Sequence, residues 1–150
     1  MIDDYEQVYQ HLQTALGLEI NPNAEYMDSL LIEYGNAMIN TGRYELAMNM
    51  EMLQNSLSEY SDYYLLMGKI YYLNNFPLKA LGALLKATTA PKIICYGTNT
   101  YFPLHIMGII YEQLGQQEMA ENCRKQAEKL ALQVLDDEGW KNKNKNTPTD

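Results

Sequence analysis

The sequence lacks the features that mark several large classes of protein. No stretch approaches the roughly 18 consecutive apolar residues that a membrane-spanning helix needs. Its two cysteines, Cys95 and Cys123, belong to no CxxC pair and have no nearby histidine to complete a metal-binding set. We therefore expect no metal site and no cofactor, and we interpret the cysteines as structural thiols instead of a disulfide.

Basic residues are scarce as well. Lysine and arginine number 11 against 19 aspartates and glutamates, which gives a formal net charge of −8. Residues 1–50 carry most of the imbalance, since eight acids face only Arg43 there, for a sum of −7. An acidic surface repels phosphates and anionic lipid, so we expect neither nucleic acid nor a membrane surface as a partner. Acidic Asp3, Asp4 and Glu6 follow Met1 where a signal peptide would be basic and then apolar, which predicts a cytoplasmic protein.

The sequence does contain amphipathic helical periodicity interrupted by turns. Apolar residues at three- and four-residue steps predict helices over about 4–17, 24–40 and 44–57. Two shorter helices lie within 64–87, on either side of the turn Asn74-Asn75-Phe76-Pro77. The chain has thirteen tyrosines but only two phenylalanines, so much of its aromatic surface carries a hydroxyl group, which suits packed helices beside a wet groove.

Three glycines that directly follow a tyrosine or methionine are each followed twelve residues later by an alanine. The pairs are Gly35 with Ala47, Gly68 with Ala80, and Gly108 with Ala120. Successive glycines are separated by 33 and then 40 residues. We expect each glycine to lie on one helix and its alanine on the next, because two small residues let the helix backbones approach closely.

This pattern resembles the tetratricopeptide repeat, W-x2-L-G-x2-Y followed by A-x3-F in about 34 residues. The matches are Tyr64-x2-Met67-Gly68-x2-Tyr71 with Ala80-x3-Leu84, and Leu104-x2-Met107-Gly108-x2-Tyr111 with Ala120. The resemblance implies an all-α fold: an α-solenoid of three helix-turn-helix repeats, at about 27–57, 60–90 and 100–132. An N-terminal helix and a C-terminal helix extension complete a single domain over 1–136, and the polar segment 137–150 is predicted to be disordered.

Two narrower resemblances concern the end of the array. The stretch Tyr96 to Ala120 is similar to the last repeat of the tetratricopeptide segments that follow many bacterial family 2 glycosyltransferase domains. The catalytic domain of those enzymes has no counterpart here, so only the scaffold is carried over. Residues 101–105, Tyr-Phe-Pro-Leu-His, resemble the tetratricopeptide chaperones of type III secretion. An insertion of about seven residues within 88–100 departs from the close spacing of those chaperones.

In tetratricopeptide arrays the first helix of each repeat lines the concave side, so the register predicts a groove. Its residues are Ile32, Asn36, Ile39, Leu65, Leu66, Lys69, Tyr72, Phe102, His105, Ile106, Ile109 and Glu112. The largely apolar surface suits an extended peptide or an amphipathic helix. Only Asn36 matches the residues that clamp a carboxylate in one branch of the family, so that clamp is rejected. The chain's own N-terminal segment or a second copy is an alternative occupant.

The leading prediction is a non-enzymatic module that binds a peptide or helix of a partner protein in this groove. No nucleophile, base and orienting group converge in the sequence, and His105 is interpreted as a groove-lining residue. Two alternatives stay open, namely a dimerising or scaffold subunit beside a glycosyltransferase and a chaperone for a secreted protein. The first of these would make the protein a homodimer.

Overall fold

The computed structural model describes residues 2–17 and 25–145, and their secondary structure is helical, with no strand among them. The elements in chain order are α1 (Ile2–Gly17), α2 (Glu25–Asn40), α3 (Tyr44–Ala47), the 3-10 helix η1 (Met48–Leu53), α4 (Gln54–Leu57), α5 (Ser61–Leu73), α6 (Pro77–Thr89), α7 (Tyr101–Gln113) and α8 (Gln117–Lys145). The expected all-α class is confirmed. None of the helices in these residues is both long enough and apolar enough to cross a bilayer.

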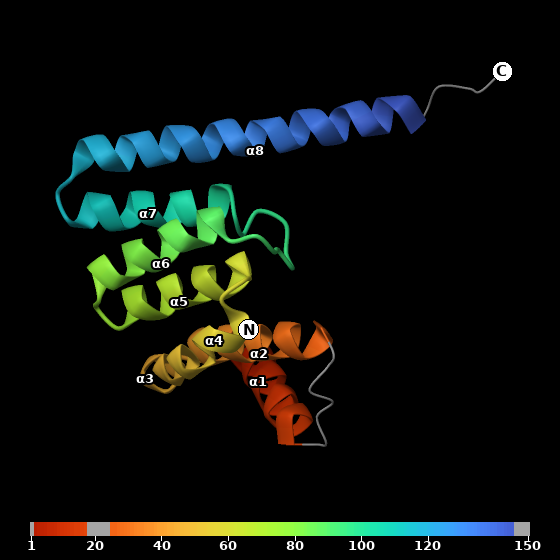
Figure 1. The fold of residues 1–150 in the computed structure, drawn as a ribbon, viewed down its shortest axis with the longest axis vertical. Helices are drawn as coiled ribbons and strands as arrows, with labels where there is room; N and C mark the ends of the chain where they lie inside the picture. Colours follow the sequence, from red (N-terminus) through yellow and green to blue (C-terminus); the bar gives the residue numbers. More distant parts are fainter. Residues whose placement is uncertain (1, 18–24, 146–150) are drawn as a thin grey trace.

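Helices that are neighbours in the sequence pack against each other. Helix α1 packs on α2, α5 on α6, α6 on α7 and α7 on α8. In Figure 1, α5 to α8 follow one another along the long axis of the molecule, and α1 to α4 lie at the opposite end from α8. The chain therefore forms packed adjacent helix pairs instead of a bundle around one central helix.

Three turns between helices share one backbone geometry. Gly42, Asn75 and Gly115 have left-handed φ angles of 79°, 65° and 76°. In each turn the next residue donates its N–H to the carbonyl five residues before it at 2.8 Å, as Phe76 does to Tyr71. This arrangement closes the last turn of the preceding helix, and it favours glycine or asparagine at the left-handed position. Each left-handed residue lies seven positions after Gly35, Gly68 or Gly108, so the turns repeat with the same spacing as the glycines.

The glycine and alanine pairs behave as expected in two of the three units. A Cβ atom added to Gly68 or Gly108 would lie 3.5 Å from the Ala80 carbonyl oxygen or 3.4 Å from that of Ala120. The backbones of α5 and α6, and of α7 and α8, therefore approach closely at these points. Gly35 differs in its nearest neighbours, because its added Cβ would lie 2.4 Å from the side chain of Leu66 and 3.1 Å from that of Met50.

The single helix predicted over 44–57 is not formed as predicted. The segment is divided into α3, the 3-10 helix η1 and α4. Its middle carbonyl, that of Met50, accepts a hydrogen bond of 2.9 Å from the buried hydroxyl of Tyr63 in α5. A side-chain donor at a helix carbonyl competes with the regular i to i−4 pattern, which accounts for the change of winding.

Both ends of the chain add a helix to this core. Tyr9 of α1 stacks on Tyr34 of α2 with ring centroids 5.5 Å apart, and the guanidinium of Arg43 lies 3.9 Å from the Tyr9 ring centroid. At the other end, α8 continues to Lys145. The sequence predicts the end of this helix at Asp136 to Gly139 and disorder over 137–150, and both predictions are wrong for residues 137–145, which continue the helix. Residues 146–150 of that predicted tail lie outside the described residues.

Candidate functional site

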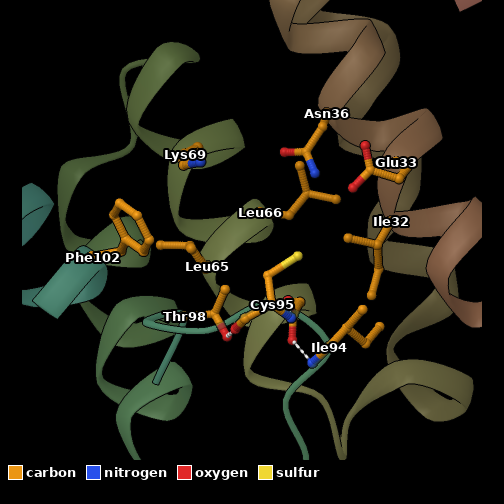
Figure 2. A pocket seen from close by; sticks show the side chains of 11 residues that line it. Ile32, Glu33, Asn36, Leu65, Leu66, Lys69, Ile94, Cys95, Thr98 and Phe102 are labelled. Carbon is orange, nitrogen blue, oxygen red and sulfur yellow. Dashed lines mark hydrogen bonds between the residues drawn. The ribbon is translucent and has the colours of Figure 1, made fainter. Parts of the chain in front are cut away.

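A cavity of about 200 Å³ opens between α2, α5, α7 and the segment 90–100 that joins α6 to α7. Figure 2 shows Phe102 on one side and Ile32 on the other, with Leu65 and Leu66 between them. The polar groups that line the cavity come from α2, α5 and the joining segment. The cavity is thus built by the first helices of the three units together with the insertion.

The structure brings together half of the residues that the sequence predicts for the groove. The lining includes Ile32, Asn36, Leu65, Leu66, Lys69 and Phe102. Leu66 is only 1% exposed and fills the space beside Gly35, so it belongs to the core as much as to the groove. Phe102 is 44% exposed, which leaves its ring accessible at the mouth of the cavity.

The other six predicted groove residues lie outside this cavity. Ile39 is buried in the core beside Met38 and Ala47. Tyr72 and Ile106 are partly buried against a second core cluster, and the Tyr72 hydroxyl accepts a hydrogen bond of 2.7 Å from Gln113. His105 and Ile109 are exposed on α7, and Glu112 forms an ion pair with Arg124. Of the groove predicted along all three first helices, the pocket includes residues near the middle of α2 and along α5, and Phe102 at the start of α7.

The joining segment forms a fixed wall of the pocket, and Asp62 holds it in place. The Asp62 carboxylate is 5% exposed and accepts the backbone N–H groups of Ile94 and Cys95 at 2.7 and 2.8 Å. On the same strand-like stretch, the Lys92 N–H donates to the Glu59 carbonyl and the Ser61 N–H donates to the Lys92 carbonyl, both at 2.9 Å. Hydrogen bonds to a carboxylate are charge-assisted and strong, so the two bonds to Asp62 anchor the wall on α5.

The turn that follows the wall is fixed by local geometry. Gly97 has a φ of 90°, and a Cβ atom there would lie 2.6 Å from the ring of Tyr101. Both the backbone angle and the close ring therefore require glycine. The buried Thr98 hydroxyl donates to the Cys95 carbonyl at 2.8 Å, which tightens the turn and places Thr98 on the pocket surface.

Lys69 is the cation among the residues that line the pocket, and Glu33 and Asp62 are the acids. Burial lowers the pKa of Lys69, and the charge of Glu33 partly opposes that effect. Within the described part of the chain, no ion pair or hydrogen bond to the Lys69 ammonium is found. The pocket therefore combines apolar walls with one partly buried charge, and Figure 2 shows Asn36 and Glu33 across from it.

Cys95 places its sulfur in the pocket, as Figure 2 shows. Burial, followed by the charges of Asp62 and Glu33, raises the pKa of this thiol. A thiol with a raised pKa stays protonated and is a weak nucleophile. Among the residues the structure describes, no group of three His, Cys, Asp or Glu side chains is placed to hold a metal ion.

Sequence reasoning missed five lining residues: Glu33, Asp62, Ile94, Cys95 and Thr98. Glu33 lies beside a predicted groove residue, so helical register was a usable signal for it. The other four depend on how the insertion folds back on α5, which no periodic pattern encodes. Comparison of the chain with protein-family models, with curated proteins and with solved structures finds no match in any of the three.

Proposed function

We propose that the protein is a non-enzymatic interaction module that binds an apolar peptide segment of a partner protein in the pocket between α2, α5 and α7. The observation that carries this proposal is the convergence of six predicted groove residues, from three separate helices, on one cavity. Apolar walls with a few polar groups are typical of surfaces that bind peptide side chains.

The fold proposed for this module is an α-solenoid of three tetratricopeptide-like repeats. Supporting it are the three turns with left-handed Gly42, Asn75 and Gly115 and the close approach of helix backbones at Gly68 and Gly108. In such an array the first helices share one side, which accounts for a pocket made by α2, α5 and α7.

The size of the pocket favours a peptide over a free small molecule. Its volume of about 200 Å³ is below the roughly 300–1,000 Å³ of most small-molecule sites. A space of this size accepts one or two apolar side chains of a longer segment that continues over the surface. Exposed Phe102 and Ile94 would contact that segment at the mouth.

The test is capture of a partner from the native organism, identified by mass spectrometry, and then a titration of the purified partner. The variant Phe102→Glu/Ile94→Glu places two charges at the mouth of the pocket while leaving the core residue Leu66 intact. We expect the dissociation constant for the identified partner to rise at least about tenfold. The control is Leu132→Glu, which changes a 60% exposed leucine on α8. Equal capture and equal affinity for the mouth variant, with an unchanged helical circular dichroism spectrum, would overturn the proposal.

A further inference from the structure

A second surface, on α6, shares no lining residue with the pocket described above. Leu78 and Leu85 are 75% and 54% exposed, and they lie seven residues apart on this helix. Residues at that spacing share one face and are separated by about 10 Å along the axis. Gly82 lies between the two leucines, so the outward face of α6 presents two large apolar side chains with a gap between them.

Gly82 is not required by the packing of the chain itself. A Cβ atom at this position would find nothing within 4 Å, whereas one at Gly68 would lie 2.6 Å from the Leu84 side chain. A glycine inside a helix weakens that helix relative to alanine. The cost is explained at Gly68 by close packing, but at Gly82 the glycine only keeps the α6 backbone accessible from outside.

A cavity of about 240 Å³ lies beside this gap, between α4, α5 and α6. Met67 and Ala83 contribute apolar surface near its middle. Lys79 and Lys86 also line it, and each ammonium lies 5.6 Å from a tyrosine ring centroid, that of Tyr71 for Lys79 and of Tyr64 for Lys86. Because the lysines are seven residues apart on α6, one lies toward each end of the cavity.

The two lysines are available to acidic groups. Both are exposed, and neither forms an ion pair within 4 Å among the described residues. They lie on the surface of a protein whose net charge is −8. Glu51 accepts a hydrogen bond of 2.7 Å from the hydroxyl of Tyr71, which lines this cavity. The face therefore offers positive charge at two points, with apolar surface between them.

From this arrangement we infer that the outward face of α6 is a docking site for an acidic amphipathic helix of a partner protein. The partner helix carries Asp or Glu at positions i and i+7, opposite Lys79 and Lys86. A small apolar residue at i+3 or i+4 lies over Gly82, where the two backbones approach closely. The exposed Leu78 and Leu85 cover the apolar face of that helix.

A second copy of this chain does not fit this description. In the whole sequence the acids spaced seven apart are Glu121 and Glu128 alone. The residues between them that would face α6, Arg124 and Lys125, are basic and would oppose Lys79 and Lys86. The occupant is accordingly a different protein.

The test uses the full chain and a designed helical peptide of about 20 residues, long enough to form several turns. The peptide has Glu at i and i+7 with Ala at i+3 and i+4, and binding is followed by fluorescence anisotropy. We expect the double variant Lys79→Glu/Lys86→Glu to weaken binding about tenfold or more, because two attractions become repulsions. The reversed variant should instead prefer a counterpart peptide with Lys at i and i+7.

The remaining variants separate this face from general charge and from folding. Gly82→Leu adds a side chain whose Cβ atom has nothing within 4 Å, and it should also weaken binding about tenfold, since it blocks close approach. Lys125→Glu/Lys129→Glu makes the same change in net charge on α8 and should leave binding unchanged. No binding of the Glu peptide, equal binding of a Gln counterpart, or no recovery in the charge-reversed pair would overturn the inference. Concentration-dependent dimers in light scattering that Gly82→Leu abolishes would overturn it in favour of self-association.

Discussion

Two regions of the molecule have the same spacing of glycine and alanine but pack differently. One region is the pair of hairpins α5–α6 and α7–α8, and the other is the first unit, made of α2, α3, η1 and α4. In the two hairpins the glycine faces the backbone of the following helix at Ala80 or Ala120. In the first unit, Gly35 faces Leu66 of α5 and Met50 of η1. The same spacing therefore gives a close helix hairpin in one region and a socket for a neighbouring unit in the other.

The difference follows from what packs on each unit. Helix α2 has α1 packed on it, with Tyr9 stacked on Tyr34, and its own second helix is broken at η1. The Tyr63 hydroxyl of α5 donates a hydrogen bond to the Met50 carbonyl of η1, so a contact from the next unit changes the winding of this segment. Four substitutions test this difference between the two regions.

The largest effect is expected at the centre of the C-terminal hairpins. Leu84 is fully buried and lies against Gly68, so Leu84→Ala removes a large core side chain. We expect the free energy of unfolding to fall by about 2–5 kcal/mol, measured by urea denaturation. Leu46→Ala in α3, where the leucine is 44% exposed, is the control and should change it by less than about 0.5 kcal/mol. Equal losses for both variants would contradict the tight packing of Leu84 in the core.

The next effect is a difference in stability between alanine substitutions at Gly68 and at Gly108. Gly68→Ala forces a Cβ to 2.6 Å from Leu84, which should cost about 1–3 kcal/mol by overpacking. Gly108→Ala meets contacts no closer than 3.4 Å and should be neutral or stabilise α7 by up to about 1 kcal/mol. Thermal unfolding of both variants and of Gly68→Ala/Leu84→Ala measures the effect. If the double variant shows no coupling between the two sites, the close contact is not the cause.

A smaller effect tests the link between η1 and α5. Burial raises the pKa of Tyr63 to about 12, so its hydroxyl stays protonated and donates to the Met50 carbonyl throughout the neutral range. Tyr63→Phe removes that donor and should lower the free energy of unfolding by about 0.5–1.5 kcal/mol. Amide hydrogen exchange should show the loss of protection concentrated at residues 48–57. Tyr26→Phe, at a tyrosine that is 58% exposed, should leave both measurements unchanged.

The smallest effect concerns the attachment of α1. Arg43 donates two hydrogen bonds to Glu6, at 2.7 and 2.9 Å, and this pairing lowers the pKa of Glu6 from its ordinary value of 4.5. A lowered pKa in the folded state means that the contribution is fully present above 4.5 and is lost as the pH falls through the folded value. We expect the NMR signals of Tyr9 to show α1 loosening in that acidic range. Glu6→Gln should remove this pH dependence; an unchanged titration in that variant would assign it to another group.

Some residues of the candidate site can be predicted from the sequence and others cannot. Helical register alone placed Ile32, Leu65 and Phe102 on one side of the array, and they line one pocket. The same register was too coarse to exclude Ile39, which the core takes up because α2 is covered on more than one side. Asp62 gave no signal in the sequence, since its two partners lie 32 and 33 residues away in a segment without periodicity.

The helical class, the positions of most helices and the turns can be predicted from the sequence, because apolar periodicity and left-handed glycine or asparagine act over a few residues. Long-range packing sets where Gly35 packs, how the segment 44–57 winds and how the insertion closes the pocket. Each of these depends on a side chain from a distant helix, Leu66, Tyr63 or Asp62, that takes up a space or a backbone group which local pattern leaves undecided.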